Sequence, residues 1–169
     1  MPLILIGGGS RSGKSRFAAS LARKRGSRLG FIATAQAHDD EMQARISTHR
    51  LDRGDEFVTI EEPYDLPGAI LSQGAQFDAV VVDCLTLWLS NLMLAEGYDV
   101  EAESARMLEA ASKSPAALLL VTNEVGCGIV PENALARRFR DAAGLLNQQT
   151  AQAADEVYWM AFGCPLRLK

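Results

Sequence analysis

The chain has 169 residues, about the size of one ordinary domain, with 48% hydrophobic and 22% charged residues. This composition excludes a mainly disordered protein, and the formal net charge of −4 disfavours general binding to nucleic acid. No apolar run is long enough to cross a membrane, and the first residues lack the basic region of a signal peptide. We therefore expect a cytoplasmic protein without a membrane anchor.

Short apolar segments alternate with helical ones along the chain. The pattern predicts, in chain order, a strand at 3–6, a loop at 7–13, a helix at 15–25, a strand at 29–33 and a helix from 39 to about 50. It continues with a strand at 57–60, a helix at 64–71, a strand at 78–84, helices at 86–95 and 100–112, a strand at 116–122, a loop at 123–131, a helix at 132–153, a strand at 156–162 and a short edge strand at 165–169. Continuously apolar strands are typical of a mostly parallel sheet that helices cover on both faces. No linker or repeat interrupts the pattern, so we expect a single domain over residues 1–169.

The chain contains three cysteines, Cys84, Cys127 and Cys164. Their number is odd, and no pair has the spacing of metal ligands. We expect free thiols in a reducing compartment, with Cys84 and Cys127 buried because they lie in or next to apolar runs.

A glycine-rich stretch follows the first predicted strand and opens the first predicted helix. It consists of Gly8, Gly9, Ser10, Arg11, Ser12, Gly13, Lys14 and Ser15, and fits the phosphate-binding pattern G-x-x-x-x-G-K-[ST] at every constrained position. The glycines let successive amides face one anion, to which the helix start adds its positive end. Lys14 would reach the β and γ phosphates, and the Ser15 hydroxyl would ligate Mg²⁺. A glycine-rich turn without a ligand is the alternative, which the flanking strand and helix disfavour.

This stretch predicts a three-layer α/β fold of the P-loop NTPase (RecA-like) type, with a mostly parallel sheet and an antiparallel edge near the C-terminus. Such a site also needs an acidic residue at the end of a neighbouring strand to orient the metal. Asp83, after a run of three valines, is the candidate. The alternative is that Asp83 caps the helix that follows it.

Two histidines occur, His38 and His49. His49 has Arg45, Arg50 and Arg53 nearby in the sequence, and such a basic cluster suits a triphosphate. Neighbouring positive charge would also keep the imidazole neutral, and a neutral imidazole is a competent nucleophile toward phosphorus. From the residues alone, a nucleophilic His49 and an ordinary surface histidine remain equally open.

Several segments resemble the bifunctional adenosylcobinamide kinase / adenosylcobinamide-phosphate guanylyltransferase family. The matching segments are residues 7–16, 31–35, 39–42, 45–50, 122–133, 138–141, 147–148 and 153–157. The stretch Asn-Glu-Val-Gly at 123–126, with Ile-Val-Pro-Glu-Asn at 129–133, is the most specific of them. The resemblance covers nearly the whole chain.

The resemblance implies two reactions of cobalamin (vitamin B12) biosynthesis. ATP or GTP phosphorylates adenosylcobinamide, and GTP then transfers GMP to the adenosylcobinamide phosphate, giving adenosyl-GDP-cobinamide and pyrophosphate. It implies that His49 carries the GMP, that Mg²⁺ assists, and that the chain forms a homotrimer. It also implies nucleotide contacts outside the glycine-rich stretch, at Ala33, Thr34, Ala35, Arg50, Leu51, Asp52, Arg53, Glu61 and Asp83.

Three further questions stay open at this stage. Asn123 and Glu124 could contact the substrate or shape a loop. An arginine cluster at 137–140 could form a basic patch or the solvated face of a helix. The apolar residues Trp88, Leu89, Leu92 and Met93 could belong to the core or to a subunit contact.

Two rival functions compete with the bifunctional transferase. One is a plain small-molecule kinase in which His49 has only a structural role. The other is a nucleotide-binding switch without catalysis. A covalent GMP label would distinguish the transferase from the first, and slow turnover with tight GDP retention would indicate the second.

Overall fold

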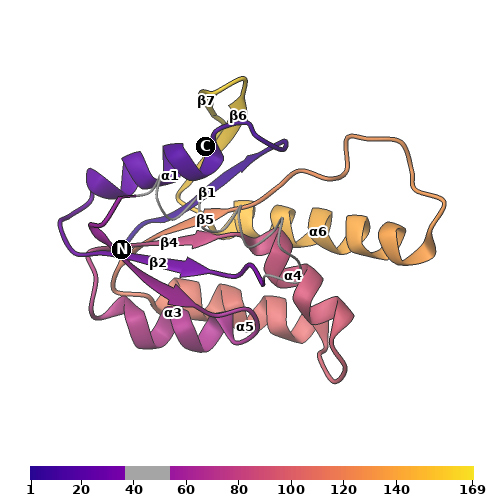
Figure 1. The fold of residues 1–169 in the computed structure, drawn as a ribbon, viewed down its shortest axis with the longest axis horizontal. Coiled ribbons are helices and arrows are strands. Elements are labelled where there is room, and N and C mark those ends of the chain that lie inside the picture. The colour runs from indigo at the N-terminus through magenta and orange to yellow at the C-terminus, as the bar shows by residue number, and fades with distance from the viewer. Residues whose placement is uncertain (37–53) are drawn as a thin grey trace.

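The computed structural model describes residues 1–36 and 54–169, and its centre is a seven-stranded sheet with the order β3-β2-β4-β5-β1-β6-β7 (Figure 1). The strands are β1 (Leu3–Gly8), β2 (Leu29–Ala33), β3 (Phe57–Glu61), β4 (Ala79–Asp83), β5 (Ala117–Val121), β6 (Glu156–Ala161) and β7 (Cys164–Arg167). The described helices are α1 (Lys14–Arg23), α3 (Leu66–Gly74), α4 (Leu85–Leu94), α5 (Val100–Lys113) and α6 (Ala134–Ala153).

All neighbouring strands pair in parallel except β6 and β7, which form an antiparallel hairpin. This arrangement confirms the predicted mostly parallel sheet with an antiparallel edge near the C-terminus. Parallel strands end at the same edge of a sheet, so the loops after β1, β2, β4 and β5 meet there. In α/β sheets, that edge is where ligands bind.

The strands bury side chains on both faces, which explains their unbroken apolar character. Ile4 and Ile6 pack with the alanines of α1 on one face. Leu3 and Leu5 point to the other face, where α3, α4, α5 and α6 cover the sheet. Figure 1 shows α1 above the sheet and α3 and α5 below it, with α6 extending to the right.

The predicted elements agree with the structure to within one to three residues at most ends. Two helix starts differ because a side chain caps the first turn: Asp65 accepts a hydrogen bond from the Gly68 amide, and Asn133 accepts one from the Ala136 amide. α3 and α6 therefore begin two residues later than predicted. The helix predicted from 39 to about 50 lies outside the described residues.

The burial pattern settles one open alternative and corrects one prediction. Trp88, Leu89 and Leu92 are fully buried in the core, and Met93 packs against it. All three cysteines are free thiols, but only Cys84 is buried. The prediction of a buried Cys127 was wrong because this residue lies in the exposed loop between β5 and α6 rather than in a strand.

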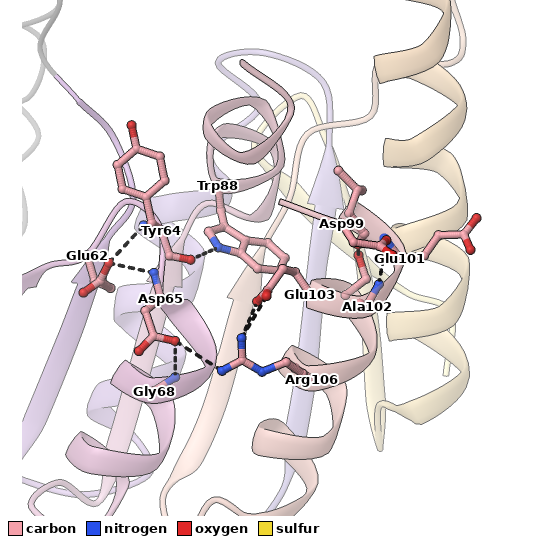
Figure 2. Close-up of polar contacts among 12 residues, drawn as sticks. Glu62, Tyr64, Asp65, Gly68, Trp88, Asp99, Glu101, Ala102, Glu103 and Arg106 are labelled. Atoms are coloured by element: carbon pink, nitrogen blue, oxygen red, sulfur yellow. Dashed lines mark hydrogen bonds and ion pairs between the residues drawn. The ribbon is translucent and has the colours of Figure 1, made fainter. Parts of the chain in front are cut away.

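A polar cluster fixes the segment between β3 and α3 (Figure 2). The Glu62 carboxylate accepts hydrogen bonds from the amides of Tyr64 and Asp65, and the Trp88 indole donates to the Tyr64 carbonyl at 2.8 Å. Arg106 of α5 contacts both Asp65, at 3.7 Å, and Glu103, at 2.8 Å. These contacts hold the chain that follows β3 against α4 and α5. In the described part of the chain, no helix has the length and apolar character needed to span a membrane.

Candidate nucleotide site

The loop between β1 and α1 has the geometry that anion binding requires. β1 ends at Gly8 and α1 begins at Lys14, with Gly13 as its N-cap in the left-handed conformation (φ 93°). No side chain caps α1, and its first turn contains no acidic residue. The amides at this helix start and the positive end of its dipole are therefore available to a phosphate.

Lys14 is buried in this loop, with only 6% of its surface exposed. Its ammonium donates to the carbonyl oxygen of Gly9 at 2.5 Å and lies 3.4 Å from the Ser12 hydroxyl. Burial lowers the pKa of Lys14, and the negative charge of nearby Asp83 acts in the opposite direction. A bound phosphate would add the negative charge that this buried cation lacks.

Gly8 is required where the loop leaves β1. Its φ of 149° belongs to a region that only glycine readily adopts, and an added Cβ would lie 2.7 Å from the carbonyl oxygen of Met160. Its own carbonyl accepts a hydrogen bond from the Glu124 amide at 3.1 Å. The loop is thus held between β6 on one side and the chain after β5 on the other.

Asp83 lies at the end of β4, as predicted, but β4 is not the immediate neighbour of β1. β5 lies between them, and the register places Asp83 beside Val121 and Val121 beside Ile6. Among the described residues, no hydrogen bond or ion pair engages the Asp83 carboxylate. Cys84 is the N-cap of α4 and no side chain caps this helix, so the alternative that Asp83 caps it is contradicted.

A magnesium site at Ser15 and Asp83 that a nucleotide would complete stays a prediction. No group of three His, Cys, Asp or Glu side chains that could hold a metal occurs in the described ranges. Mg²⁺ in nucleotide enzymes needs only one or two protein ligands, because phosphate oxygens and water supply the rest. The carboxylate of Asp83 and the hydroxyl of Ser15, at the second position of α1, are the two side chains that would hold the ion.

The ends of β2 and β3 continue the same edge of the sheet. Ala33 is in register with Asp83 on one side and with Glu61 on the other. Ala33 and Ala35 are partly exposed, and Glu61 is exposed. The predicted nucleotide contacts at these three residues therefore share one edge with Asp83, and they stay predictions.

Thr34 has a structural part in this edge. It is fully buried, its hydroxyl donates to the Cys84 carbonyl and accepts from the Cys84 amide, both at 2.8 Å, and its carbonyl accepts from Asn91. Its amide donates to the Asp83 carbonyl at 3.2 Å. With all its polar atoms engaged, Thr34 locks β2 to β4. The nucleotide contact predicted at Thr34 stays a prediction.

The remaining predicted site residues are His49, Arg50, Leu51, Asp52 and Arg53. They lie outside the described residues, as does His38. The roles assigned to them by resemblance therefore stay predictions.

Asn123 and Glu124 join the loop after β5 to the phosphate-binding loop. The Asn123 amide donates to the Thr86 hydroxyl at 2.7 Å, and the Glu124 amide donates to the Gly8 carbonyl. The Glu124 carboxylate accepts from the Gly126 amide within its own turn. These contacts favour the loop-shaping alternative for the two residues.

A chain of buried hydroxyl and amide groups supports this junction, and sequence reasoning missed it. The Thr122 hydroxyl lies 3.2 Å from that of Thr86 and donates to Asn147 of α6 at 2.6 Å. Each residue follows or lies within an apolar segment, so only the fold brings the three together. In the sequence, family resemblance is the one signal that marks residues 147–148.

The arginines of α6 hold the same loop. Arg137 donates to the carbonyls of Pro131 and Glu132, and Arg140 donates to the carbonyl of Gly126 at 2.5 Å. The third arginine, Arg138, is exposed. Two of the three arginines therefore fasten the loop between β5 and α6, a role that neither expected alternative described.

Solved structures with a similar fold agree with this reading of the sheet and loop. The RadB recombinase aligns with a TM-score of 0.52 at 15% identity, over 94% of this chain and 73% of its own. A protein of Pyrococcus horikoshii OT3 aligns with a TM-score of 0.56 at 7% identity, over 99% of this chain and 86% of its own. At such low identity these likenesses concern the fold, and they support the P-loop NTPase architecture.

Sequence comparisons identify the family. A model described as cobinamide kinase / cobinamide phosphate guanyltransferase matches residues 4–168. The bifunctional adenosylcobalamin biosynthesis protein CobP of Pseudomonas aeruginosa is 43% identical over 98% of this chain and 96% of its own length. The corresponding CobU proteins of Escherichia coli K12 and Salmonella typhimurium LT2 are 40% and 41% identical over 99% of both chains. The chain therefore belongs to the cobinamide kinase / cobinamide phosphate guanyltransferase family.

Proposed function

We propose that this protein is a bifunctional transferase of cobalamin biosynthesis. It phosphorylates adenosylcobinamide with ATP or GTP, and then transfers GMP from GTP to the resulting phosphate. The observation that carries the proposal is the uncapped start of α1 with buried Lys14, whose charge interacts with that of Asp83, in a chain of this family. Membership of this family does not support the rival function of a nucleotide-binding switch without catalysis.

The kinase step needs positioning and charge neutralisation rather than a covalent intermediate. The acceptor hydroxyl attacks the γ-phosphorus, the bond to the β-phosphate oxygen breaks, and ADP or GDP leaves. Lys14 and the amides at the start of α1 hold the β and γ phosphate oxygens as negative charge develops on them. Mg²⁺ held by Ser15 and Asp83 would neutralise part of the same charge.

The guanylyl step takes place at the α-phosphorus of a nucleoside triphosphate rather than at its γ-phosphorus. A neutral imidazole nitrogen of His49 attacks the α-phosphorus of GTP, a P–N bond forms, and the bond to pyrophosphate breaks. Lys14 and the loop amides stabilise the departing pyrophosphate. An oxygen of adenosylcobinamide phosphate then attacks the same phosphorus, the P–N bond breaks, and adenosyl-GDP-cobinamide forms.

The two steps should separate in a His49→Ala variant. We expect it to lose covalent labelling by GTP that carries radioactivity on its α-phosphate, and to lose guanylyl transfer, while cobinamide phosphorylation remains measurable. His38→Ala is the matched control, because it removes the chain's only other histidine, and it should label like the wild type. Label on the wild type should be lost in acid and kept in base, as a phosphoramidate requires.

Two results would contradict this assignment. Retention of the label by the His49→Ala variant would place the nucleophile elsewhere. Absence of label on the wild type, with kinase activity intact, would favour the plain kinase. Lys14→Ala serves as the shared-loop control and should impair both steps, by about 100-fold or more if it acts as other charge-stabilising donors do.

We also propose that the protein works as a homotrimer in the cytoplasm. Family resemblance supports the trimer, and exposed apolar side chains on α4, α6 and the loop between β5 and α6 offer surface for it. Three free thiols suit a reducing compartment.

A further inference from the structure

The turn of the β6–β7 hairpin presents a fully exposed aromatic ring. Phe162 has 102% of its reference surface exposed, which is the highest value among the large hydrophobic residues described. Its φ of 52° lies in the left-handed region, which is uncommon for a residue other than glycine. A fully exposed phenyl ring on a strained turn does not contribute to the packing of the fold.

This turn lies directly against the phosphate-binding loop. A Cβ placed on Gly13 would be 3.6 Å from the Cα of Gly163 and 3.9 Å from the side chain of Met160. A guanidinium nitrogen of Arg16, in the first turn of α1, would be 4.0 Å from a Cβ on Gly163. Gly163, the residue after Phe162, therefore lies close to Gly13, the N-cap of α1.

The sheet order sets the direction in which a bound triphosphate runs. In a P-loop site the serine of the loop and the acidic residue would hold a metal ion, which neutralises charge at the terminal phosphates. Here Asp83 lies two strands from β1 in the direction of β2, whereas the hairpin lies on the opposite side of β1. With the γ phosphate toward Asp83, the α phosphate and nucleoside leave the loop toward β6 and β7.

The distance suits a base at this position. Strands in a sheet are about 4.8 Å apart, so β6 and β7 lie roughly 5–10 Å from β1 along the sheet. A nucleoside that leaves the loop in this direction reaches the hairpin turn before it reaches solvent.

We propose that Phe162 is the platform on which the base of the phosphoryl donor stacks in the kinase step. This inference rests on the proposed function and deepens it by placing the donor nucleoside. Aromatic stacking reads the face of a base rather than its hydrogen-bonding edge, so the platform accepts adenine and guanine alike. Arg16 is placed to contact the ribose or the α phosphate beside it.

The same geometry separates the donor sites of the two reactions. The nucleotide contacts predicted at Ala33, Ala35 and Glu61 lie on the far side of Asp83 from the hairpin, where they suit the guanosine of the guanylyl-transfer orientation. Phe162 therefore belongs to the phosphoryl-transfer orientation of the nucleotide and not to the guanylyl-transfer orientation.

The test is Phe162→Ala, with Phe162→Trp as the conservative variant and Leu166→Ala as a matched control on β7. Leu166 is 57% exposed and lies on the same hairpin. We expect Phe162→Ala to raise the KM for ATP and for GTP in cobinamide phosphorylation about tenfold, with little change in kcat. Phe162→Trp and Leu166→Ala should keep the wild-type KM, and the KM for GTP in guanylyl transfer should not change.

Binding measurements keep this test independent of the proposed reactions. Calorimetry with a non-hydrolysable ATP analogue should show about tenfold weaker binding to Phe162→Ala, whereas inorganic triphosphate, which has no base, should bind both proteins equally. An unchanged affinity for the analogue would overturn the platform, and so would equal weakening for inorganic triphosphate, because it would indicate a distorted loop. Light scattering of each variant would show whether the Phe162 ring instead contributes to assembly of the oligomer. If KM changed together with the molecular mass, the proposal would be overturned. If the wild type phosphorylated no cobinamide, the proposed function would fail while the calorimetric comparison still decided the role of Phe162.

Discussion

Lys14 shows how a single side chain in this loop serves both structure and chemistry. Its ammonium donates a hydrogen bond to the Gly9 carbonyl and approaches the Ser12 hydroxyl, and both contacts hold the side chain inside the loop. Burial lowers the pKa of Lys14, and negative charge next to it, such as that of Asp83, acts in the opposite direction. A triphosphate would supply that charge, and the loop is therefore organised for it before it binds.

Gly8 and Gly9 are adjacent in this loop, but a side chain would be strained at Gly8 and would fit at Gly9. We expect Gly8→Ala to lower the free energy of unfolding by about 1–3 kcal/mol, because its φ of 149° strains any side chain and its Cβ would meet the Met160 carbonyl. Gly9→Ala is the matched control, since nothing lies within 4 Å of a Cβ there, and its change should stay within about 0.5 kcal/mol. Denaturant unfolding of the nucleotide-free proteins measures both. Equal stability of the two variants would contradict this account of the loop.

At the scale of elements, the turn between α1 and β2 is tied to the start of β4. Asp78 accepts hydrogen bonds from the amides of Ser27 and Arg28, each at 3.0 Å, and from the Arg28 guanidinium at 2.6 Å. These bonds lower the pKa of Asp78 to about 2, with the Arg28 side chain as the largest cause. The carboxylate thus aligns the beginnings of two neighbouring strands, which are in register from Leu29 and Ala79 onward.

The lowered pKa predicts how stability depends on pH. The folded pKa of Asp78 lies below its ordinary value of 3.8, so its stabilisation is complete above about pH 4 and is lost as the pH falls toward 2. We expect Asp78→Asn to melt a few degrees below the wild type at pH 7, with a difference that shrinks between pH 4 and 2. Thermal unfolding across this range measures it.

Glu109→Gln is the control for the charge alone. Its carboxylate forms one exposed ion pair with Lys113 on α5, and such pairs contribute little. Its melting temperature should stay close to that of the wild type at every pH. If the difference in melting temperature between Asp78→Asn and the wild type persisted unchanged at pH 2, the effect would come from the shape of the side chain rather than from its charge.

For the whole molecule, the described surface has an apolar groove between α4 and α6. This groove of about 230 Å³ is lined by Ser90, Met93, Leu94, Asn133, Leu135, Ala136 and Phe139. Leu94 and Leu135 at this groove are 69% and 44% exposed, and Ile129 in the nearby loop is 97% exposed. Apolar surface of this kind marks interaction sites more often than free surface.

The proposed trimer predicts what disrupting this surface does. We expect the wild type to have the mass of a trimer in light scattering, and the double variant Leu94→Lys, Leu135→Lys to shift toward the monomer because buried charge opposes association. Leu71→Lys is the control, as it places the same charge on α3 at a residue that is 49% exposed. An identical mass for the double variant and the wild type would place the subunit contact elsewhere.

Most of the fold follows from local patterns and was therefore predictable. Apolar runs such as 117–121 and 79–83 identify buried strands because both faces of the sheet are covered. The phosphate-binding loop is recognisable because its glycines, lysine and serine act through positions fixed along the chain. The predicted starts of α3 and α6 were less accurate because Asp65 and Asn133 cap these helices from positions that the apolar periodicity does not mark.

By itself the sequence determined the nature of the site: a triphosphate loop, an acidic residue at a strand end, and a family with two transfer reactions. The tertiary structure decided the arrangement, since the order of parallel strands depends on contacts between distant segments. It separated Asp83 from the loop by β5, used Thr34 to lock β2 to β4, and brought the β6–β7 turn against Gly13. Each of these contacts joins residues more than 35 positions apart, so no local pattern records it.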